Sequence, residues 1–283
     1  MNKKSVSIYI PAFNAEKTIR KTLNSIKNQS YQFEEITVIN DNSNDSTLDI
    51  VKEFKDINII NNIENKGLGY NRNLGVKNSS HKIIASIDAD VVLENNWLEI
   101  MIKNFEQSEN IICGGKMVEE LVQNKFNLWR AKYYSQNWGN KSFENPPFLY
   151  GCNTIQHKTV WATVKGYDEG FHTNGEDINY SNKIKSYRHL KMKYCSDALA
   201  KHLQDDNLKT LSNRVWRYHS FGYKIKDPSY YRTLRLSFKQ IKFFFQRSLK
   251  NLVKLEFNFI YINFVILIKF IVLEHSYYKK LKK

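Results

Sequence analysis

The stretch that decides the fold is Ile83-Ile84-Ala85-Ser86-Ile87-Asp88-Ala89-Asp90. A short apolar run of this length fits a buried strand, and two aspartates separated by one residue follow it. Residues two apart on an extended chain point to the same side, so these carboxylates should repel each other unless a cation lies near them. Mg²⁺ or Mn²⁺ would relieve that repulsion. An isolated triplet of this kind is more often a solvated turn, and its place after a buried strand is what favours the ion.

The same alternation of strand and helix recurs through the first third of the chain. Strands are predicted at residues 6–10, 35–39, 57–60 and 83–87, and helices at about residues 15–28, 46–54, 68–77 and 97–105. Strand–helix alternation with short links predicts an α/β fold with a parallel sheet covered on both faces. Ligands of such sheets bind at the carboxyl ends of the strands, so we expect the chemistry there.

Three of the predicted strands end in polar segments. The first ends in Pro11-Ala12-Phe13-Asn14, the second runs into residues 40–47 (NDNSNDST), and the fourth ends in Asp88-Ala89-Asp90. Asn, Asp and Ser are also ordinary turn formers and helix caps, so each segment alone has a structural explanation. Three such ends at one edge of a sheet favour a binding site.

Composition and charge limit the class of protein. Hydrophobic residues make up 42% of the 283 residues, which excludes a disordered chain, and 11 Gly with 4 Pro exclude a collagen-like one. The three cysteines, Cys113, Cys152 and Cys195, fit neither a disulfide framework nor a CxxC metal site, so we expect a reducing compartment. No signal peptide is expected after Met1.

The ordered set of motifs is similar to family 2 glycosyltransferases of the GT-A fold over about residues 5–223. The matching segments are Pro11–Asn14, Asp41–Thr47, Asn65-Lys66-Gly67, Asn71–Gly75, Asp88–Asp90, Gly166–Phe171 and Gly175-Glu176-Asp177. The resemblance implies a Rossmann-like nucleotide-diphospho-sugar transferase domain over residues 1–223. Its nucleotide-binding half would cover about residues 1–110 and its acceptor half about residues 111–223, and a helical tail would follow at 224–283.

The resemblance also implies a donor site. Pro11, Ala12, Phe13 and Asn14 would line the nucleotide pocket, together with Ala89 and Asp88, and Asp88 would lie by the ribose and the metal. Asp41 would accept hydrogen bonds from the base. Arg72 sits where the family has a basic residue near the nucleotide, although a surface arginine or a partner of Asp45 is an equal alternative.

The same resemblance implies the metal and the catalytic base. Asp90 would be the main ligand of a Mn²⁺ or Mg²⁺ ion that bridges the diphosphate, with Asp88 and His202 as further ligands. A structural histidine is the alternative for His202. Asp177 would be the base of an inverting transfer and Glu176 a positioning residue, although adjacent acids also favour a helix N-terminus.

Two features bear on the acceptor. Longer processive relatives carry a QxxRW motif, whereas Ser212-Asn213-Arg214-Val215-Trp216 lacks the glutamine, so we expect the addition of one sugar. A group of aromatic residues would line the acceptor groove or, equally, form a core under a long loop. Its members are Trp129, Tyr133, Tyr134, Trp138, Phe148 and Tyr150.

The tail holds most of the net charge. Residues 224–283 contain 14 basic and three acidic side chains, which accounts for +11 of the formal +15. Residues 232–256 alternate apolar and basic side chains at helical spacing, which is typical of a helix on an anionic bilayer surface. The apolar run at 257–273 is short for a membrane span and includes Asn258, Asn263 and Lys269. Packing on the catalytic domain or a homo-oligomer interface is the alternative.

The sequence therefore predicts a metal-dependent glycosyltransferase, peripheral to the cytoplasmic face of the membrane, that moves one sugar from a nucleotide-sugar, UDP first, to a glycan or lipid-linked acceptor. A nucleotide-sugar-binding pseudo-enzyme or scaffold is one rival, and loss of all transfer activity would favour it. A nucleic-acid-binding protein is a second rival, and the apolar face of the tail disfavours it. A nucleotidyltransferase is a third, and the lack of an early Gly-rich basic loop disfavours it.

Overall fold

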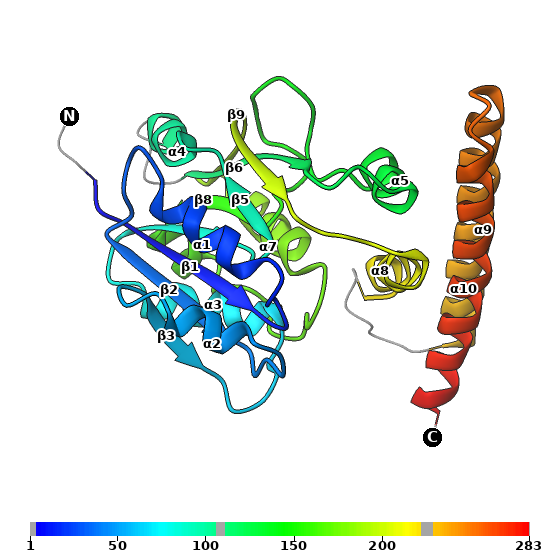
Figure 1. The fold of residues 1–283 in the computed structure, drawn as a ribbon, viewed down its shortest axis with the longest axis horizontal. Coiled ribbons are helices and arrows are strands. Elements are labelled where there is room, and N and C mark those ends of the chain that lie inside the picture. The colour runs from blue at the N-terminus through cyan, green and yellow to red at the C-terminus, as the bar shows by residue number, and fades with distance from the viewer. Residues whose placement is uncertain (1–3, 106–110, 222–228, 283) are drawn as a thin grey trace. The chain divides into compact units, whose positions relative to one another are not determined.

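A mixed sheet carries the candidate site. The computed structural model describes residues 4–105, 111–221 and 229–282. Within these ranges the strands lie in the order β3-β2-β1-β4-β8-β6-β9-β5, and β7 pairs with β9 (Figure 1). The strands are β1 Val6–Ala12, β2 Glu35–Asn40, β3 Asn58–Asn61, β4 Ile83–Ile87, β5 Val91–Leu93, β6 Ile111–Glu119, β7 Phe143–Glu144, β8 Asn153–His157 and β9 Lys191–His202.

The first four strands are parallel, as predicted. β1 pairs with β2 and β4, and β2 pairs with β3, all in the parallel sense. Every residue of β1 and β4 is buried, as expected for strands covered on both faces. Helices connect these strands: α1 Ile19–Lys27, α2 Thr47–Lys52 and α3 Leu68–Asn78, with α4 Trp97–Phe105 after β5. The α/β fold class predicted from the alternation is confirmed.

Three later strands complete the sheet next to β4. β8 lies antiparallel to β4, β6 lies antiparallel to β8, and β9 lies parallel to β6 with a shift in register between Gly115 and Lys116. β5 pairs antiparallel with the end of β9, and its Val91 is opposite His202. This topology brings the end of β9 beside the segment that follows β4, two parts of the chain more than 100 residues apart in sequence.

The structure divides into two compact units. The first holds residues 1–120 and 136–203, which include the sheet, α6 Lys158–Thr163 and α7 Glu176–Lys185. The second holds residues 121–135 and 204–283, with α5 Lys125–Tyr133, α8 Leu208–Phe221, α9 Tyr230–Val253 and α10 Phe257–Leu281. The boundary predicted at 223/224 lies outside the described residues, as does the one at about residue 110, and both stay predictions. The second unit includes α5 and α8, which the sequence analysis assigned to the acceptor half.

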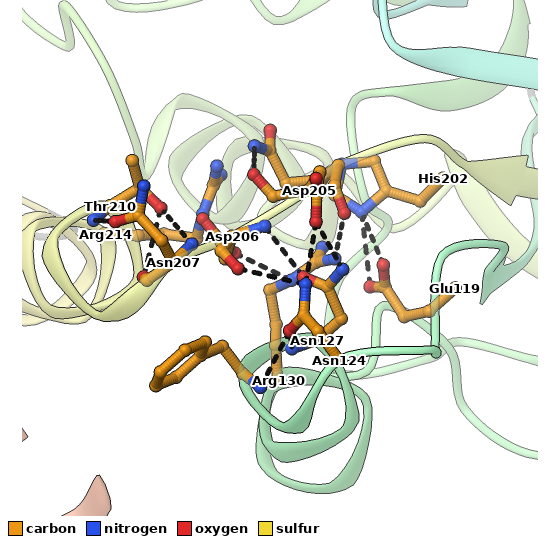
Figure 2. Close-up of polar contacts among 12 residues, drawn as sticks. Glu119, Asn124, Asn127, Arg130, His202, Asp205, Asp206, Asn207, Thr210 and Arg214 are labelled. Atoms are coloured by element: carbon orange, nitrogen blue, oxygen red, sulfur yellow. Dashed lines mark hydrogen bonds and ion pairs between the residues drawn. The ribbon is translucent and has the colours of Figure 1, made fainter.

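Buried polar contacts hold the second unit together. The carboxylate of Asp206 is fully buried, and its Oδ2 lies 2.9 Å from Arg130 Nε and 3.4 Å from Arg214 Nε (Figure 2). Glu274 on α10 is also fully buried, and its Oε1 lies 2.6 Å from Arg232 Nη1 on α9. A buried charge is tolerated only when it is paired in this way, so these contacts fix how the helices pack.

Helix α9 has an inverted pattern of polarity, and helix α10 also has apolar side chains at its exposed positions. Four of the five buried residues of α9 are polar, namely Thr233, Ser237, Gln240 and Asn251. The exposed positions include a run of apolar side chains along both helices: Phe238, Phe245, Leu249, Leu252, Phe257, Tyr261, Phe264, Ile268 and Val272. A helix of a water-soluble protein has the opposite pattern. This exposed apolar run, called the outer face below, therefore lacks a partner within the described residues.

Helix α10 is longer than the predicted apolar run and extends to Leu281. By length and composition it could cross a membrane, with a mean hydropathy of 1.9, and 28% of its most apolar window is buried. α9 carries basic residues along its length and cannot do the same.

Helix α3 approaches the sheet closely because it has glycine at the contact. A Cβ at Gly75 would lie 2.3 Å from Cγ of the buried Tyr9 ring on β1. We expect Gly75→Ala to lower the free energy of unfolding by about 1–3 kcal/mol, because the crowding outweighs the roughly 1 kcal/mol gained in helix propensity. Urea denaturation measures the change. Lys77→Ala, at an exposed position of α3, is the control and should stay within about 0.5 kcal/mol; equal effects of the two variants would contradict the close contact.

Candidate active site

The loop after β1 is tied to the loop after β2. Pro11 and Ala12 are buried at the end of β1, whereas Phe13 is 48% exposed. Asn14 has φ of 51°, a left-handed conformation that asparagine tolerates well. Its backbone N–H donates to Ser43 Oγ at 3.0 Å, and its Oδ1 accepts from Asn44 N at 2.8 Å. The polar residues at these two strand ends thus form one surface, as the sheet topology led us to expect.

Asp41 is buried and organises the segment before α3. Its Oδ1 accepts from Asn62 Nδ2 and from Lys66 N, both at 2.8 Å, and its Oδ2 accepts from Gly67 N at 2.9 Å. A carboxylate has about four acceptor positions, so one remains for a further donor. The predicted contact of Asp41 with a base stays a prediction.

Arg72 is the central cation of the site. It projects from α3 and is 1% exposed. Its Nη2 lies 3.0 Å from Asp88 Oδ1, and its Nε lies 3.1 Å from Glu176 Oε1. Its Nη1 donates to Ser86 Oγ at 2.8 Å and to Gly151 O at 2.9 Å. The alternative of a surface arginine is therefore wrong, and Arg72 joins the end of β4 to the start of α7.

Asp177 lies at the first turn of α7, after Gly175, whose φ is 92°. Its Oδ1 accepts from Ile178 N at 2.7 Å, and its Oδ2 accepts from Gly151 N at 3.3 Å. Gly151 thus donates to Asp177 and accepts from Arg72. This role of Gly151 was not predicted from the sequence, because a single glycine before β8 gives no signal of its own.

The group around Arg72 contains more carboxylates than basic side chains, and the pKa values of these carboxylates are raised. Burial raises the pKa of Glu176 to about 8, with a further contribution from Asp177, and Arg72 offsets only part of this effect. Burial also raises the pKa of Asp177 and of Asp88. Burial alone would lower the pKa of Arg72, but Asp88 and Glu176 outweigh it and raise that pKa well above its usual range. One guanidinium shared among several acids keeps its own charge without fully stabilising theirs.

A second group lies at the end of β9. His202 Nε2 is 3.3 Å from Asp90 Oδ2, and His202 Nδ1 is 3.1 Å from Glu119 Oε2. Figure 2 shows the Glu119 carboxylate facing the His202 ring. Burial alone would lower the pKa of His202, but Asp90 and Glu119 raise it to about 9. The sequence analysis did not identify Glu119, which lies in the less regular middle of the chain.

The described residues do not provide a complete set of metal ligands. In residues 4–105, 111–221 and 229–282, no cluster of three or more His, Cys, Asp or Glu side chains has the geometry to hold a metal ion. Asp90 and His202 together offer one oxygen and one nitrogen, and Asp88 is engaged by Arg72. An ion at this place would need further ligands from a bound anion.

The predicted aromatic group falls into two separate clusters. Trp138, Phe148 and Tyr150 lie in the first unit, with ring centroids 4.9–5.9 Å apart. The other three residues pack in the second unit, where the Arg247 guanidinium lies 5.0–5.2 Å from the rings of Trp129, Tyr133 and Tyr134. Only the first cluster adjoins Gly151 in sequence and hence the Asp177 carboxylate.

Comparison with known proteins identifies the family of the chain. A model of glycosyl transferase family 2 matches residues 7–164, more than half of the chain. An uncharacterised glycosyltransferase of Haemophilus influenzae is 29% identical over 197 residues, which cover 67% of this chain and 61% of that protein. Poly-beta-1,6-N-acetyl-D-glucosamine synthase of Staphylococcus aureus is 28% identical over 239 residues, which cover 81% of this chain and 57% of that protein. The chain thus matches less than two thirds of each relative's length.

Solved structures show the same fold. The crystal structure of S. aureus TarS 1-349 in complex with UDP has a TM-score of 0.58 and 17% identity, covering 98% of this chain and 92% of that chain. GalNAc-T7 with UDP, GalNAc and Mn²⁺ has a TM-score of 0.57 and 16% identity, covering 77% of this chain and 50% of that chain. With its GT-A fold and the family match over residues 7–164, the chain belongs to glycosyl transferase family 2 and is a glycosyltransferase.

Proposed function

We propose that this enzyme transfers a single sugar from a nucleoside diphosphate sugar, with UDP as the first candidate, to a glycan or lipid-linked acceptor with inversion at the sugar. The observation that carries the proposal is the linked pair of acidic groups at the strand ends. Asp88 and Asp90 follow β4, Glu176 and Asp177 begin α7, and Arg72 bridges the two. The group of Asp88 and Asp90 suits a cation and a diphosphate, and the group of Glu176 and Asp177 suits a proton transfer.

The residues at the end of β4 and β9 fit a divalent ion. Asp90 Oδ2 and His202 Nε2 are 3.3 Å apart, close to the roughly 3 Å that separates neighbouring ligands of one octahedral ion with bonds of about 2.1 Å. Asp90 and His202 would hold Mn²⁺ or Mg²⁺, with Asp88 beside them, and diphosphate oxygens would complete the ligand set. Bound there, the ion would stabilise charge on the leaving nucleoside diphosphate.

The loops after β1 and β2 suit the nucleotide. Residues 11–14 and Asp41 lie at neighbouring strand ends, where ligands of parallel sheets bind. We assign the donor pocket to Pro11, Ala12, Phe13, Asn14, Asp41, Arg72, Asp88 and Ala89. Phe13 offers an exposed ring on which a base can stack, and the remaining acceptor position of Asp41 suits a base N–H.

Asp177 suits the role of catalytic base. Its carboxylate accepts from two backbone N–H groups, which fixes its orientation. In an inverting transfer it would take the proton of the acceptor hydroxyl while that oxygen attacks the anomeric carbon from the side opposite the leaving group. Glu176 would position Arg72 and hold the charge balance of the site. The glutamine missing before Arg214 and Trp216 supports addition of one sugar at a time.

The outer face of α9 and α10 supports attachment to the cytoplasmic surface of the membrane. Its apolar side chains suit the acyl region, and exposed Arg235, Lys239, Lys242 and Lys250 on α9 suit anionic headgroups. The six basic residues of α9 favour a helix that lies in the interface over one that spans it. A homo-oligomer through the outer face is the alternative.

The first prediction concerns the donor and the metal. We expect UDP with Mn²⁺ to raise the melting temperature more than either alone, because a ligand that binds the folded state stabilises it. Asp90→Asn should lose the Mn²⁺-dependent part and abolish transfer, whereas the exposed control Asp197→Asn should keep both. A shift with UDP that is the same in EDTA and in Mn²⁺ would contradict a bridging metal. If the protein binds UDP-sugars but releases no UDP from them with any acceptor extract, the pseudo-enzyme is favoured.

The second prediction concerns the base. Asp177→Asn should lower kcat by roughly 10²-fold or more with UDP affinity little changed, because the amide cannot accept the acceptor's proton. In the wild type, burial raises the pKa of Asp177, so kcat/KM should fall on acidification at a pH above that of a free aspartate. Asp49→Asn, at an exposed position of α2, is the control. A large loss of UDP affinity with kcat preserved would instead place Asp177 in the donor pocket.

The third prediction concerns the membrane. Replacing Phe238, Phe245 and Leu249 by serine should prevent flotation with vesicles, since each buried side chain contributes about 1.5–3 kcal/mol at full burial. Replacing Lys239, Lys242 and Lys250 by glutamine should weaken binding to anionic vesicles at low salt, by about 1 kcal/mol per residue. The matched control is glutamine at the exposed Lys52, Lys55 and Lys141. If the wild type stays in the soluble fraction with both neutral and anionic vesicles, and the serine variant differs from it in oligomeric state, the homo-oligomer is favoured.

A further inference from the structure

Glu119 makes a contact that the proposed chemistry has not yet used. It is the last residue of β6, and its side chain is 5% exposed. Both of its carboxylate oxygens lie within hydrogen-bond distance of His202 Nδ1, Oε1 at 3.2 Å and Oε2 at 3.1 Å. A buried carboxylate that faces one ring nitrogen with both oxygens constrains the rotation of that ring.

Strand register explains why these side chains meet. Glu119 on β6 is paired with His202 on the parallel strand β9, and His202 is paired with Val91 on the antiparallel strand β5. Backbone bonds fix this arrangement, because Glu120 N donates to His202 O at 3.0 Å and Leu203 N donates to Asp90 O at 2.8 Å. His202 is therefore held between Glu119 on one side and Asp90 on the other.

The contact with Glu119 determines which nitrogen of the His202 ring carries a hydrogen. A carboxylate accepts hydrogen bonds and donates none, so the Nδ1 facing Glu119 carries a hydrogen. With the Nδ1 hydrogen held by Glu119, Nε2, which lies 3.3 Å from Asp90 Oδ2, is the nitrogen that would give up its hydrogen to bind an ion. In metal sites generally, a carboxylate that accepts from the far nitrogen of a histidine fixes its tautomer and ring orientation.

We infer that Glu119 is a positioning residue that holds His202 with Nε2 toward the metal beside Asp90. The inference rests on the proposed metal-dependent transfer. Glu119 acts through His202 and is not assigned as a ligand of the ion. Its effect is therefore on metal affinity, and the chemical step at saturating metal is left nearly unchanged.

Two substitutions separate orientation from charge. Glu119→Ala removes the acceptor and leaves the His202 Nδ1–H without this partner, whereas Glu119→Gln loses the charge but keeps an oxygen that can accept the same bond. Glu120→Ala is the matched control, since Glu120 is the next residue and its side chain is 45% exposed and 3.8 Å from Lys201. Circular dichroism and the melting temperature check that each variant folds.

The measurement is Mn²⁺ binding to the full chain in the presence of UDP, followed by electron paramagnetic resonance of the free ion. We expect Glu119→Ala to weaken Mn²⁺ binding roughly 10–100-fold, the usual effect of losing such a partner. Glu119→Gln and Glu120→Ala should stay within about threefold of wild type. The Mn²⁺ concentration for half-maximal transfer should rise in parallel for Glu119→Ala, with kcat at saturating Mn²⁺ nearly unchanged.

A spectroscopic signature distinguishes failure of this inference from failure of the metal proposal. Coupling between bound Mn²⁺ and a histidine nitrogen, seen by electron spin echo modulation, should be present in the wild type and weaker in Glu119→Ala. Wild-type protein that binds no Mn²⁺ with UDP would overturn the metal site and the role of Glu119 with it. Bound Mn²⁺ without nitrogen coupling, or equal affinities of wild type and Glu119→Ala, would overturn the role of Glu119 alone. An equal loss in Glu119→Gln and Glu119→Ala would show that charge matters and orientation does not.

Discussion

An excess of buried negative charge at the carboxyl ends of the strands is the constraint on which the site depends. Five acidic side chains, Asp88, Asp90, Glu119, Glu176 and Asp177, lie within two linked groups, and Arg72 and His202 are the basic side chains that contact them. Burial prevents water from stabilising these charges, so the pKa values of Asp88, Glu176 and Asp177 are raised. A site with this surplus of negative charge favours the binding of a proton or a cation. A divalent ion that binds together with a diphosphate would supply the cation.

The fold creates this surplus by bringing distant segments to one edge of the sheet. β4 delivers Asp88 and Asp90, β9 delivers His202 after crossing the sheet beside β6, and α7 delivers Glu176 and Asp177. Arg72 on α3, which packs closely on β1 through Gly75, contacts Asp88 after β4 and Glu176 at the start of α7. Gly151 then ties Arg72 to Asp177 through its backbone, and a Cβ there would lie 3.1 Å from the guanidinium. Gly75 and Gly151, which have no reacting side chain, thus help to hold the site residues in place.

Local patterns predicted the first half of the fold and part of the site. The parallel strands and their helices follow from hydrophobic periodicity, and Asp88 and Asp90 follow from their place after a buried strand. The antiparallel insertion of β8 and the register shift in β6 could not be predicted, because long-range pairing leaves no periodic signal in either strand. Glu119 and Gly151 were missed for the same reason, since each acquires its role from a partner more than 20 residues away. The surface alternative for Arg72 was open because its partners, Asp88 and Glu176, are 16 and 104 residues distant.

The second unit has buried charged residues and an exposed apolar face. Several of its charged residues are buried and paired, as in the contacts of Asp206 with Arg130 and of Glu274 with Arg232, while the outer face is apolar. The sequence analysis recognised the basic and apolar character of residues 224–283 but not that α5 and α8 belong to the same unit. α5 and α8 join it because Trp129, Leu211 and Val215 pack against Ile262 and Ile266. An apolar face of this kind suits a lipid surface better than water.

The location of a bound ion decides whether the excess of acidic side chains at the strand ends holds a metal. A crystal of the protein with UDP and Mn²⁺, measured near the manganese absorption edge, gives an anomalous-difference map in which the metal is unambiguous. We expect one peak at about 2.1–2.3 Å from Asp90 Oδ2 and His202 Nε2, in contact with the diphosphate. A nucleotide bound at the strand ends with no peak there, or a peak away from Asp90, would contradict it.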